Sequence, residues 1–483
     1  MQTPFRQPND LVIPRNFIRA VRDSGYLSTA TALAELVDNA LQASATTVAI
    51  AVSRASPDAL PEISVTDNGV GMSRTDLEQC LRFGGTSRFD GRTSFGRFGM
   101  GLPAASLSQA RRIEVASWRG HGVEDVVALD VDAIVTGVEP ILTIRQGPQG
   151  TSESGCRVRW MQCDRIEYRR LAWLERSLRR DLGRMYRRFI ADGLNMTIND
   201  RHVDALDPTF LTAERDADRA QLAFDDLSFE FETVGGDLSV VTARFVILPI
   251  EKWHRFDNAT KRRIGIVSGG SVSILRAGRE IANGWHLMGG KRRENYDDWW
   301  RCEIDFDPPL DEHFGITINK QGIRPCAALR EAIEPELEAR ARILNARVRQ
   351  AFEDAKFRSG AETSCNVAAA ADRYLPVFAS GSDSRPTGPL AYKVSTTHLP
   401  PDELFTTSLQ SNTLEVRLNV DHPAFSALYR PLQAMTDIVG AEFRTAFELL
   451  FLSFARSAAA SPGNTERLVA DWGATYGRML QEA

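Results

Sequence analysis

The chain has 483 residues, of which 43% are hydrophobic and 25% are charged, so it is too long for one core and resembles an ordinary globular protein of roughly three domains. This composition excludes a disordered or fibrous protein, and the formal net charge of −5 means that any binding of nucleic acid would depend on a local basic patch. The six cysteines are scattered without a CxxC pair, so we expect reduced thiols, no zinc and no disulfide. We find neither a secretion signal nor an apolar run as long as a membrane span, so we expect a cytoplasmic location.

The first part of the chain predicts helices that alternate with strands. Residues 28–44 have the apolar spacing of a helix that begins after Ser28, a typical cap. We expect strands at "TTVAIAVS" and "EISVTD", a turn at "DNGVGM", a helix at "SRTDLEQCLRF", a glycine-rich loop over residues 84–101 and then a further helix. Later strands are expected at residues 111–118, 125–131, 140–147 and 156–160. This order predicts an α/β (α+β) sandwich in which helices cover one face of a sheet.

The rest of the chain predicts a second α/β unit, a long helix and a small C-terminal region. Residues 165–190 predict a helix with an arginine-rich face and an apolar stripe of Leu171, Leu174, Leu178, Leu182, Met185 and Phe189. The second unit is expected to end near residue 330. The helix over 331–377 has a stripe of Ile333, Leu337, Leu344, Val348 and Phe352. The composition of 378–390 indicates a linker, and residues 391–483 predict the strand "TLEVRLNV" and two helices, one of which buries "FELLFLSFA".

Three polar residues interrupt the apolar sequence "ALAELVDNALQAS". Glu35 and Asn39 are four residues apart and share one helix face, and Asp38 lies one turn from Glu35. A carboxylate beside a carboxamide suits a base that orients water, together with an oxygen ligand for Mg²⁺. The alternative interpretation is a helix edge whose polar face meets solvent.

Two glycine-containing motifs follow this helix. In "VTDNGVGM", Asp67 ends an apolar strand and could accept a hydrogen bond from an amine such as that of adenine, while Gly69 and Gly71 allow the backbone to approach a flat base. The same letters also describe a common turn. In "RFGGTSRFDGRTSFGRFGMGLPAAS", the glycines lead into a helix whose free N–H groups could bind phosphates, and the alternative interpretation is a flexible loop.

Together these motifs resemble the Bergerat nucleotide fold of the GHKL superfamily, which includes gyrase-type topoisomerases, a heat-shock chaperone, sensor histidine kinases and MutL mismatch-repair proteins. The segments "ALAELVDNALQA", "DNGVGM" and "RFGMGLPAASLSQARRI" look most similar to the MORC ATPases and their bacterial relatives, and the close matches cover residues 28–115. The resemblance implies an ATPase that uses ATP and Mg²⁺. It implies that Glu35 is the general base, that Asn39 ligates Mg²⁺ and that Asp67 binds adenine. Further contacts are implied for Gly69, Gly71 and Met72 beside the base, Gly96, Gly99, Met100, Gly101 and Leu102 around the phosphates, Thr86 and Ser87 in the mobile lid, and Asp38 at the edge of the site.

The sequence departs from the family pattern at two places. Relatives often carry a lysine where Pro103 stands, and this difference removes one phosphate-binding charge. The family's later Gly-Thr element falls on "SGCRVRW", where Gly155 is followed by Cys156, a weaker hydrogen-bonding residue than threonine. Thr151 is an imperfect substitute for the adenine contact from this strand.

The resemblance also implies a domain order. An ATPase domain with an N-terminal strap would occupy residues 1–164, and residues 165–330 resemble the transducer domain of the same ATPases, which folds like ribosomal protein S-five. In relatives a transducer lysine reaches the γ-phosphate, and Lys320 in "FGITINKQGIRP" looks like that switch lysine. The alternative interpretation is a solvated lysine at the end of a strand.

The function implied by the resemblance is an ATP-gated clamp. Nucleotide would order the lid, residues 1–27 would brace a second subunit, and the homodimer would hold DNA or a partner protein until hydrolysis reopens it. MORC-like bacterial relatives are linked by resemblance to restriction-modification and phage-defence settings, so a role in DNA metabolism or antiviral defence is an expectation. A sensor histidine kinase requires a phosphoacceptor histidine, usually before its ATP domain, whereas the first histidine here is His121. A chaperone-like ATP-binding scaffold with incidental hydrolysis is the remaining alternative.

Basic residues indicate a separate route to nucleic acid. Eleven arginines between Arg157 and Arg188, and the loop "GGKRREN" around Lys291, could contact phosphodiester groups, with Trp299 and Trp300 as aromatic partners. The alternative interpretation is a solvated helix face and a buried aromatic core.

Overall fold

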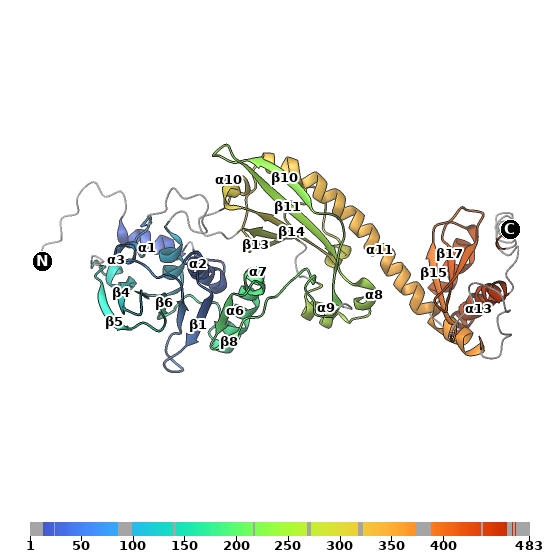
Figure 1. Ribbon diagram of the computed structural model, residues 1–483, viewed down its shortest axis with the longest axis horizontal. Helices are drawn as coiled ribbons and strands as arrows, with labels where there is room; N and C mark the ends of the chain where they lie inside the picture. Colours follow the sequence, from blue (N-terminus) through green and yellow to red (C-terminus); the bar gives the residue numbers. More distant parts are fainter. Residues whose placement is uncertain are drawn as a thin grey trace. The chain divides into compact units, whose positions relative to one another are not determined.

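The structure is a computed structural model that describes residues 13–23, 25–85, 99–138, 142–215, 218–267, 272–316, 322–372, 388–435, 438–460, 466 and 469 (Figure 1). The chain divides into two compact units. The first consists of Met1–Pro249 and Phe256–Leu344, and the second of Ile250–Arg255 and Asn345–Ala483. Each unit is described by itself.

The first unit contains an eight-stranded sheet, called here the first sheet, with the strand order β5-β4-β3-β6-β2-β1-β7-β8. Its neighbouring strands are antiparallel except for β1 and β7, which are parallel. The strands are β1 Thr47–Ser53, β2 Glu62–Asp67, β3 Arg112–Trp118, β4 Val123–Asp130, β5 Arg145–Gln149, β6 Gly155–Met161, β7 Asn195–Ile198 and β8 Arg201–His202. Strand β2 therefore lies in the interior of the sheet, between β1 and β6.

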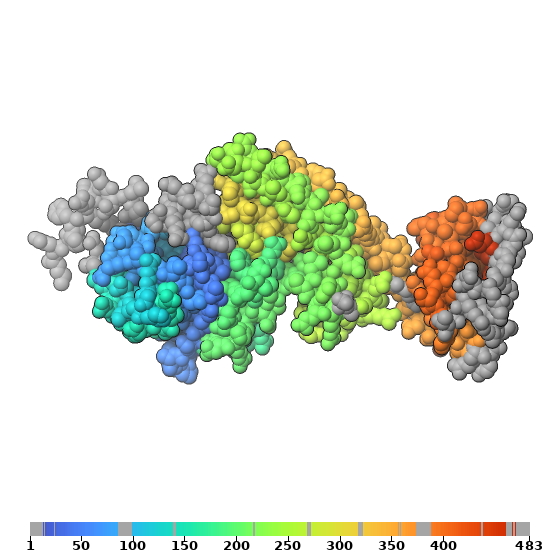
Figure 2. All heavy atoms as spheres, viewed as in Figure 1, coloured from blue at the N-terminus to red at the C-terminus, as the bar shows by residue number. Residues whose placement is uncertain are grey.

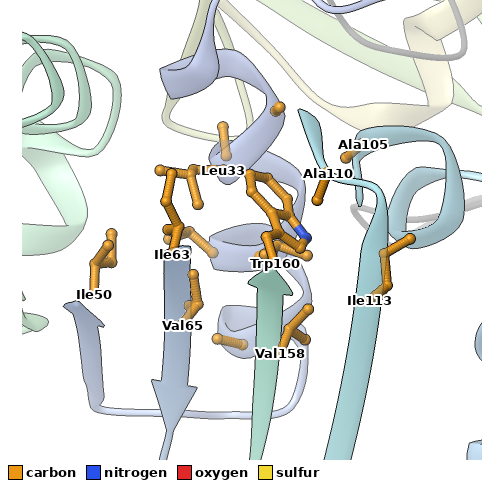
Figure 3. Packing of buried hydrophobic residues seen from close by; sticks show 14 of the residues in the cluster. Leu33, Ile50, Ile63, Val65, Ala105, Ala110, Ile113, Val158 and Trp160 are labelled. Atoms are coloured by element: carbon orange, nitrogen blue, oxygen red, sulfur yellow. The ribbon is translucent and has the colours of Figure 1, made fainter. Parts of the chain in front are cut away.

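Helices cover one face of this sheet. The helices of this part of the chain are α1 Pro14–Asp23, α2 Thr29–Gln42, α3 Arg74–Gln79, α4 Gly101–Gln109, α5 Val131–Val135, α6 Leu171–Met185 and α7 Arg187–Ala191. Leu33 of α2 and Ala105 of α4 pack with Ile63 and Trp160 of the sheet, and all four are buried (Figure 3). Burying a leucine side chain contributes roughly 1.5–3 kcal/mol. The predicted α/β sandwich with one covered face is confirmed.

Helix α2 begins where the sequence predicts. The Ser28 hydroxyl accepts the backbone N–H of Thr31 at 3.1 Å, and the Thr31 hydroxyl in turn accepts the N–H of Ser28 at 3.0 Å. This reciprocal cap satisfies two backbone donors that the first helical turn leaves open.

Elements that follow residue 164, the predicted end of the ATPase domain, also belong to the first sheet and its core. Strand β7 pairs with β1 from Thr47 to Ile50, and the apolar stripe of α6 is buried in the core of the first sheet through Leu174, Leu178 and Leu182. Figure 1 and Figure 2 show α6 (green) beside α2 and β1 (blue), and α6 contacts both of these elements. The first sheet and its core therefore extend to about Val203. The sequence does not show this extent, because a helical stripe reveals an apolar face but not the surface that the face covers.

Helix α1 packs on its own domain. Ile18 and Arg22 are buried. The Arg22 guanidinium donates to the carbonyl oxygens of Leu107 at 2.9 Å and Ala110 at 2.6 Å, and it also pairs with Asp164. Within the segment that was expected to brace a second subunit, residues 14–23 thus contact this same chain. Residues 1–12 lie outside the described residues.

A second sheet follows in the first unit, with the order β10-β11-β14-β12-β13 and with β9 paired to β11. Its strands are β9 Gln221–Leu222, β10 Leu227–Glu232, β11 Leu238–Ile247, β12 Val272–Arg276, β13 Arg279–Gly284 and β14 Trp300–Phe306. The associated helices are α9 Asn258–Ile264, η2 Asn295–Trp299, η3 Pro308–Leu310 and α10 Asp311–Phe314. The long helix α11, Ala327–Asp372, comes next, and Ile333, Leu337 and Leu344 of its predicted stripe are fully buried.

The second unit has a small sheet and its own core. Its elements are α8 Ile250–Trp253, the later part of α11, β15 Ala391–Thr397, β16 Phe405–Gln410, β17 Thr413–Asn419, η4 Phe425–Tyr429, α12 Arg430–Ala434 and α13 Ile438–Ala460. Val416, Phe451 and Leu452 are buried in this core, so the predicted strand and the buried apolar helix are confirmed. Within the described ranges no helix combines the length and apolarity needed to cross a membrane.

Candidate functional site

Helix α2 is the centre of the candidate site. Residues 32–38 are all buried, whereas Asn39 is exposed. Glu35 is only 3% exposed and Asp38 only 1% exposed. The alternative of a polar face that meets solvent therefore does not hold for these two carboxylates. Glu35 and Asn39 remain one turn apart on the same helix, as the sequence predicts.

The start of α4 lies against the Glu35 side chain. A Cβ atom added to Gly101 would lie 2.5 Å from Glu35 Oε2, so only glycine allows this approach. The N-cap residue Met100 makes no side-chain cap, and its helix presents the positive end of its dipole at this point. Gly99 has a φ of +59°, which favours glycine, and its carbonyl oxygen accepts the N–H of Gly84 at 3.1 Å. This bond joins the two ends of the glycine-rich segment.

The neighbouring residues of α4 are packed toward the domain interior. Leu102 contacts the core of the first sheet and Pro103 is buried. Proline is tolerated in the first turn of a helix because its missing N–H would have no helical partner there. The position at which relatives often carry lysine is therefore an apolar packing position in this chain.

Asp67 lies at the end of β2 in the interior of the sheet. Its Oδ1 atom accepts the backbone N–H of Gly69 at 2.9 Å. Burial raises the pKa of Asp67 above its ordinary value, and the backbone N–H groups of Gly69 and Cys156 partly oppose this rise. This partly buried carboxylate can accept a further hydrogen bond from a donor such as an amine.

The turn after Asp67 is attached to α2 and to β3. Val70 donates its N–H to Ala43 O at 3.0 Å, and a Cβ atom at Gly69 would come within 2.8 Å of the same oxygen. Gly71 has a φ of +68°, and Met72 donates its N–H to the Ser117 hydroxyl at 2.7 Å. Helix α2 thus contacts both glycine motifs, one through Ala43 and the other through Glu35.

Strand β6, which has Cys156 where the family pattern has threonine, pairs with the strand that ends at Asp67. Cys156 is the ladder partner of Asp67, and a Cβ atom at Gly155 would lie 2.3 Å from Asp67 O. Glycine is therefore required at position 155. Thr151 is exposed in the preceding loop, and its contact with adenine remains a prediction. The Ser154 hydroxyl, which the sequence reasoning did not single out, donates to Gly69 O at 2.7 Å.

Asp38 is held by residues from later parts of the chain. The Tyr186 hydroxyl lies 2.7 Å from Asp38 Oδ1 and 2.8 Å from Ala34 O, and Arg279 pairs with Asp38 Oδ2. Burial raises the pKa of Tyr186 well above its ordinary value. Asp38 therefore attaches α2 to Tyr186 and Arg279. Sequence reasoning missed Tyr186 and Arg279, because no local pattern joins residues separated by 148 and 241 positions.

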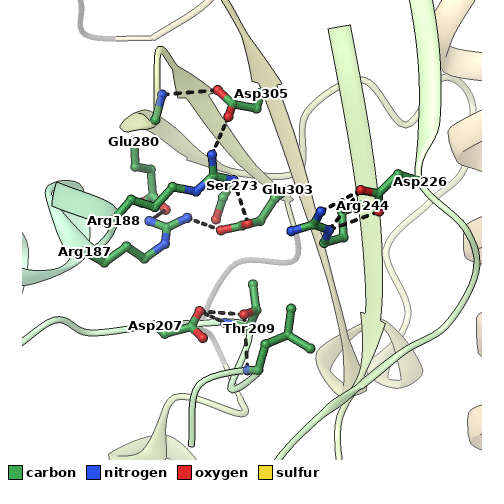
Figure 4. A network of polar contacts seen from close by, with 12 residues as sticks. Arg187, Arg188, Asp207, Thr209, Asp226, Arg244, Ser273, Glu280, Glu303 and Asp305 are labelled. Carbon is green, nitrogen blue, oxygen red and sulfur yellow. Dashed lines mark hydrogen bonds and ion pairs between the residues drawn. The ribbon is translucent and has the colours of Figure 1, made fainter. Parts of the chain in front are cut away.

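Most of the arginines proposed for nucleic acid are engaged in ion pairs. The paired members are Arg157, Arg159, Arg165, Arg179, Arg180, Arg184, Arg187 and Arg188. Figure 4 shows how Arg187 and Arg188 reach Glu280, Glu303 and Asp305 of the second sheet. These arginines therefore join α7 to that sheet.

In the loop around Lys291 the lysine is buried, whereas Arg292 and Arg293 are exposed. Lys291 is buried and pairs with Asp297 at 2.8 Å, and its ammonium lies 4.9 Å from the centre of the Trp285 ring. Trp299 and Trp300 are buried as well. For Lys291 and these two tryptophans, the interpretation as packed core holds.

Four of the predicted site residues, Thr86, Ser87, Gly96 and Lys320, lie outside the described residues. The roles that the family resemblance implies for them therefore remain predictions.

No curated protein matches the chain. Residues 27–151 match the family model described as histidine kinase-, DNA gyrase B-, and HSP90-like ATPase. This segment contains α2, the turn after β2 and the start of α4, where Glu35, Asp67 and Gly101 lie. The match supports the GHKL family, and with it an ATP-binding ATPase domain, for this part of the chain.

Proposed function

We propose that the chain is a Mg²⁺-dependent ATPase in which Glu35 activates the attacking water. The observation that carries this proposal is the position of the buried Glu35 carboxylate against Gly101 at the start of α4. A carboxylate beside a helix N-terminus is next to the place where backbone N–H groups bind phosphate. The exposed Asn39 lies one turn away on the same helix.

The residues present suit ATP and Mg²⁺. Asp67 offers a partly buried acceptor for the adenine amine, and Gly69 and Gly71 place no side chain in the adjoining turn. Asn39 offers the hard oxygen ligand that Mg²⁺ prefers. Bound Mg²⁺ supplies charge neutralisation on the phosphates. Glu35 holds the water and accepts its proton, a role in which a side chain typically contributes about 10²–10⁴ in rate.

The proposal extends to a MORC-like, ATP-gated homodimer that clamps DNA or a partner protein, with a role in DNA metabolism or phage defence. The motifs shared with MORC ATPases support this extension. Lys320 enters it as the switch lysine through the same resemblance. The alternative, a scaffold that binds ATP and hydrolyses it incidentally, is opposed by the buried placement of Glu35 beside the phosphate-binding helix start.

The clamp is tested by measuring the mass of the purified protein in solution by light scattering. We expect the mass to double when a non-hydrolysable ATP analogue is added with Mg²⁺. DNA is added in parallel samples, and salt-resistant retention of circular but not linear DNA is the expected sign of a closed clamp. A mass that neither the analogue nor DNA changes would contradict the clamp while leaving the ATPase proposal open to its own tests.

The close approach of α4 to Glu35 leads to a prediction for Gly101→Ala. The new methyl group would displace the Glu35 carboxylate, and a displacement of about 1 Å can cost about 10²-fold in rate. We therefore expect steady-state phosphate release to fall by at least about tenfold. Gly290→Ala is the control, because a Cβ atom there meets nothing within 4 Å. Equal turnover in the two variants would contradict the proposed position of the base.

A further inference from the structure

We propose that Arg279 is a positioning residue for the ATPase site: from β13 of the second sheet it holds α2 through Asp38, so that the placement of Glu35 depends on that sheet. The inference rests on the proposed role of Glu35 as the base. Arg279 acts through Asp38 and α2, and it belongs to the part of the chain that follows the nucleotide-binding segment.

The contact is fully enclosed by protein. Arg279 is 3% exposed and Asp38 is 1% exposed, and their ion pair joins Nη1 of the arginine to Oδ2 of the aspartate. The Tyr186 hydroxyl reaches Oδ1 of the same carboxylate and the carbonyl oxygen of Ala34. Arg279 in turn lies over the Tyr186 ring, with its Cζ atom 5.7 Å from the ring centre. The anchored positions 34 and 38 lie on either side of Glu35 along the helix.

Arg279 keeps its charge in this buried position. Burial alone would lower the pKa of Arg279, but the nearby carboxylates of Asp38 and Glu35 raise it above its ordinary value. The guanidinium therefore stays positively charged.

The hairpin that carries Arg279 is itself held in place. Ala277 and Gly278 form its two-residue turn with φ values of +49° and +79°, and the turn pairs Arg276 with Arg279. The next residue, Glu280, accepts Arg184 at 2.6 Å and Arg187 at 2.7 Å. Adjacent residues of β13 thus contact three helices: Glu280 contacts α6 and α7, and Arg279 contacts α2. Arg279 is the one that reaches the helix with the base.

The test compares turnover with nucleotide affinity in Arg279→Gln and Arg279→Lys. We expect Arg279→Gln to lower kcat by at least about tenfold, while the Kd for a non-hydrolysable ATP analogue changes by less than about threefold, since Asp67 and its turn are untouched. Arg279→Lys, which keeps the buried charge, should recover part of the loss in kcat. Arg301→Gln is the matched control, because Arg301 is another buried arginine of the second sheet and bonds to Gly265 O and Ile266 O.

The double variant Asp38→Asn with Arg279→Gln removes both buried charges, so it is the control for misfolding caused by an unpaired charge. We expect it to fold and to bind the analogue, yet to turn over ATP as slowly as Arg279→Gln. Turnover equal to that of the parent protein in either Gln variant would overturn the inference, as would a parallel loss of affinity and kcat in Arg279→Lys. If the parent protein shows no turnover that depends on Glu35, the proposed function itself has failed.

Discussion

Glu35→Gln is expected to reduce the rate of ATP hydrolysis by about 10²–10⁴-fold, the usual contribution of a general base. This loss corresponds to about 3–5 kcal/mol in the activation barrier. Glutamine has nearly the same shape as glutamate, so it should fit beside Gly101, but it cannot accept the proton of the attacking water. Because the side chain is buried beside α4 and the substitution leaves Asp67 and its turn unchanged, we expect the Kd for ATP to remain within about threefold.

The measurement is single-turnover hydrolysis with enzyme in excess, which separates chemistry from product release. Glu124→Gln is the matched control, since Glu124 is also fully buried, lies in β4 of the first sheet and pairs with Arg157. That variant should lose stability without losing turnover in the folded fraction. If Glu35→Gln hydrolyses ATP as fast as the parent protein, Glu35 is not the base.

Asp67→Asn is expected to weaken ATP binding by about 10–100-fold, since a hydrogen bond to a charged group contributes roughly 1.5–3 kcal/mol. An ionised carboxylate accepts hydrogen bonds but cannot donate them, whereas a carboxamide can also donate an N–H to the base. Discrimination between ATP and GTP should therefore decrease in the variant. Asp76→Asn is the control, because Asp76 is exposed and caps α3 together with Ser73.

The same residue leads to an expected pH dependence of binding. Burial raises the pKa of Asp67 above 3.8, and only the ionised form accepts the adenine amine with full strength. The affinity of the parent protein should therefore fall as the pH is lowered through this raised pKa, whereas the affinity of Asp67→Asn should change less. Calorimetric titration of the analogue at several pH values tests both points. An unchanged affinity of Asp67→Asn at neutral pH would contradict the adenine contact.

Local patterns were sufficient for the elements that carry the site. The cap at Ser28 and the apolar spacing after it predicted α2, and the alternation in "EISVTD" predicted the strand that ends at Asp67. The glycines at 69, 71 and 101 reflect backbone approaches that leave no room for a Cβ atom. Such features depend on a residue and its near neighbours, so they can be inferred from sequence.

Other features depended on which distant segments meet. The arginines after residue 164 form an exposed basic face on a helical projection, but Arg184 and Arg187 pair with Glu280 of the second sheet. The short strand β7 joins the first sheet through β1, which lies more than a hundred residues earlier in the chain. Neither pairing has a local signature, because the acidic partner and the neighbouring strand are brought close only by packing.

By itself, the sequence determined the secondary structure around the site and the chemical groups that it contains, because periodicity, caps and glycine positions are local. The tertiary structure decided the setting of those groups. It placed Glu35 beside Gly101, partly buried Asp67 at the end of β2, and joined Asp38 to Arg279 across 241 positions of the chain. Burial and charge pairing are properties of the folded environment, and two buried charges become partners only when the elements that carry them pack together.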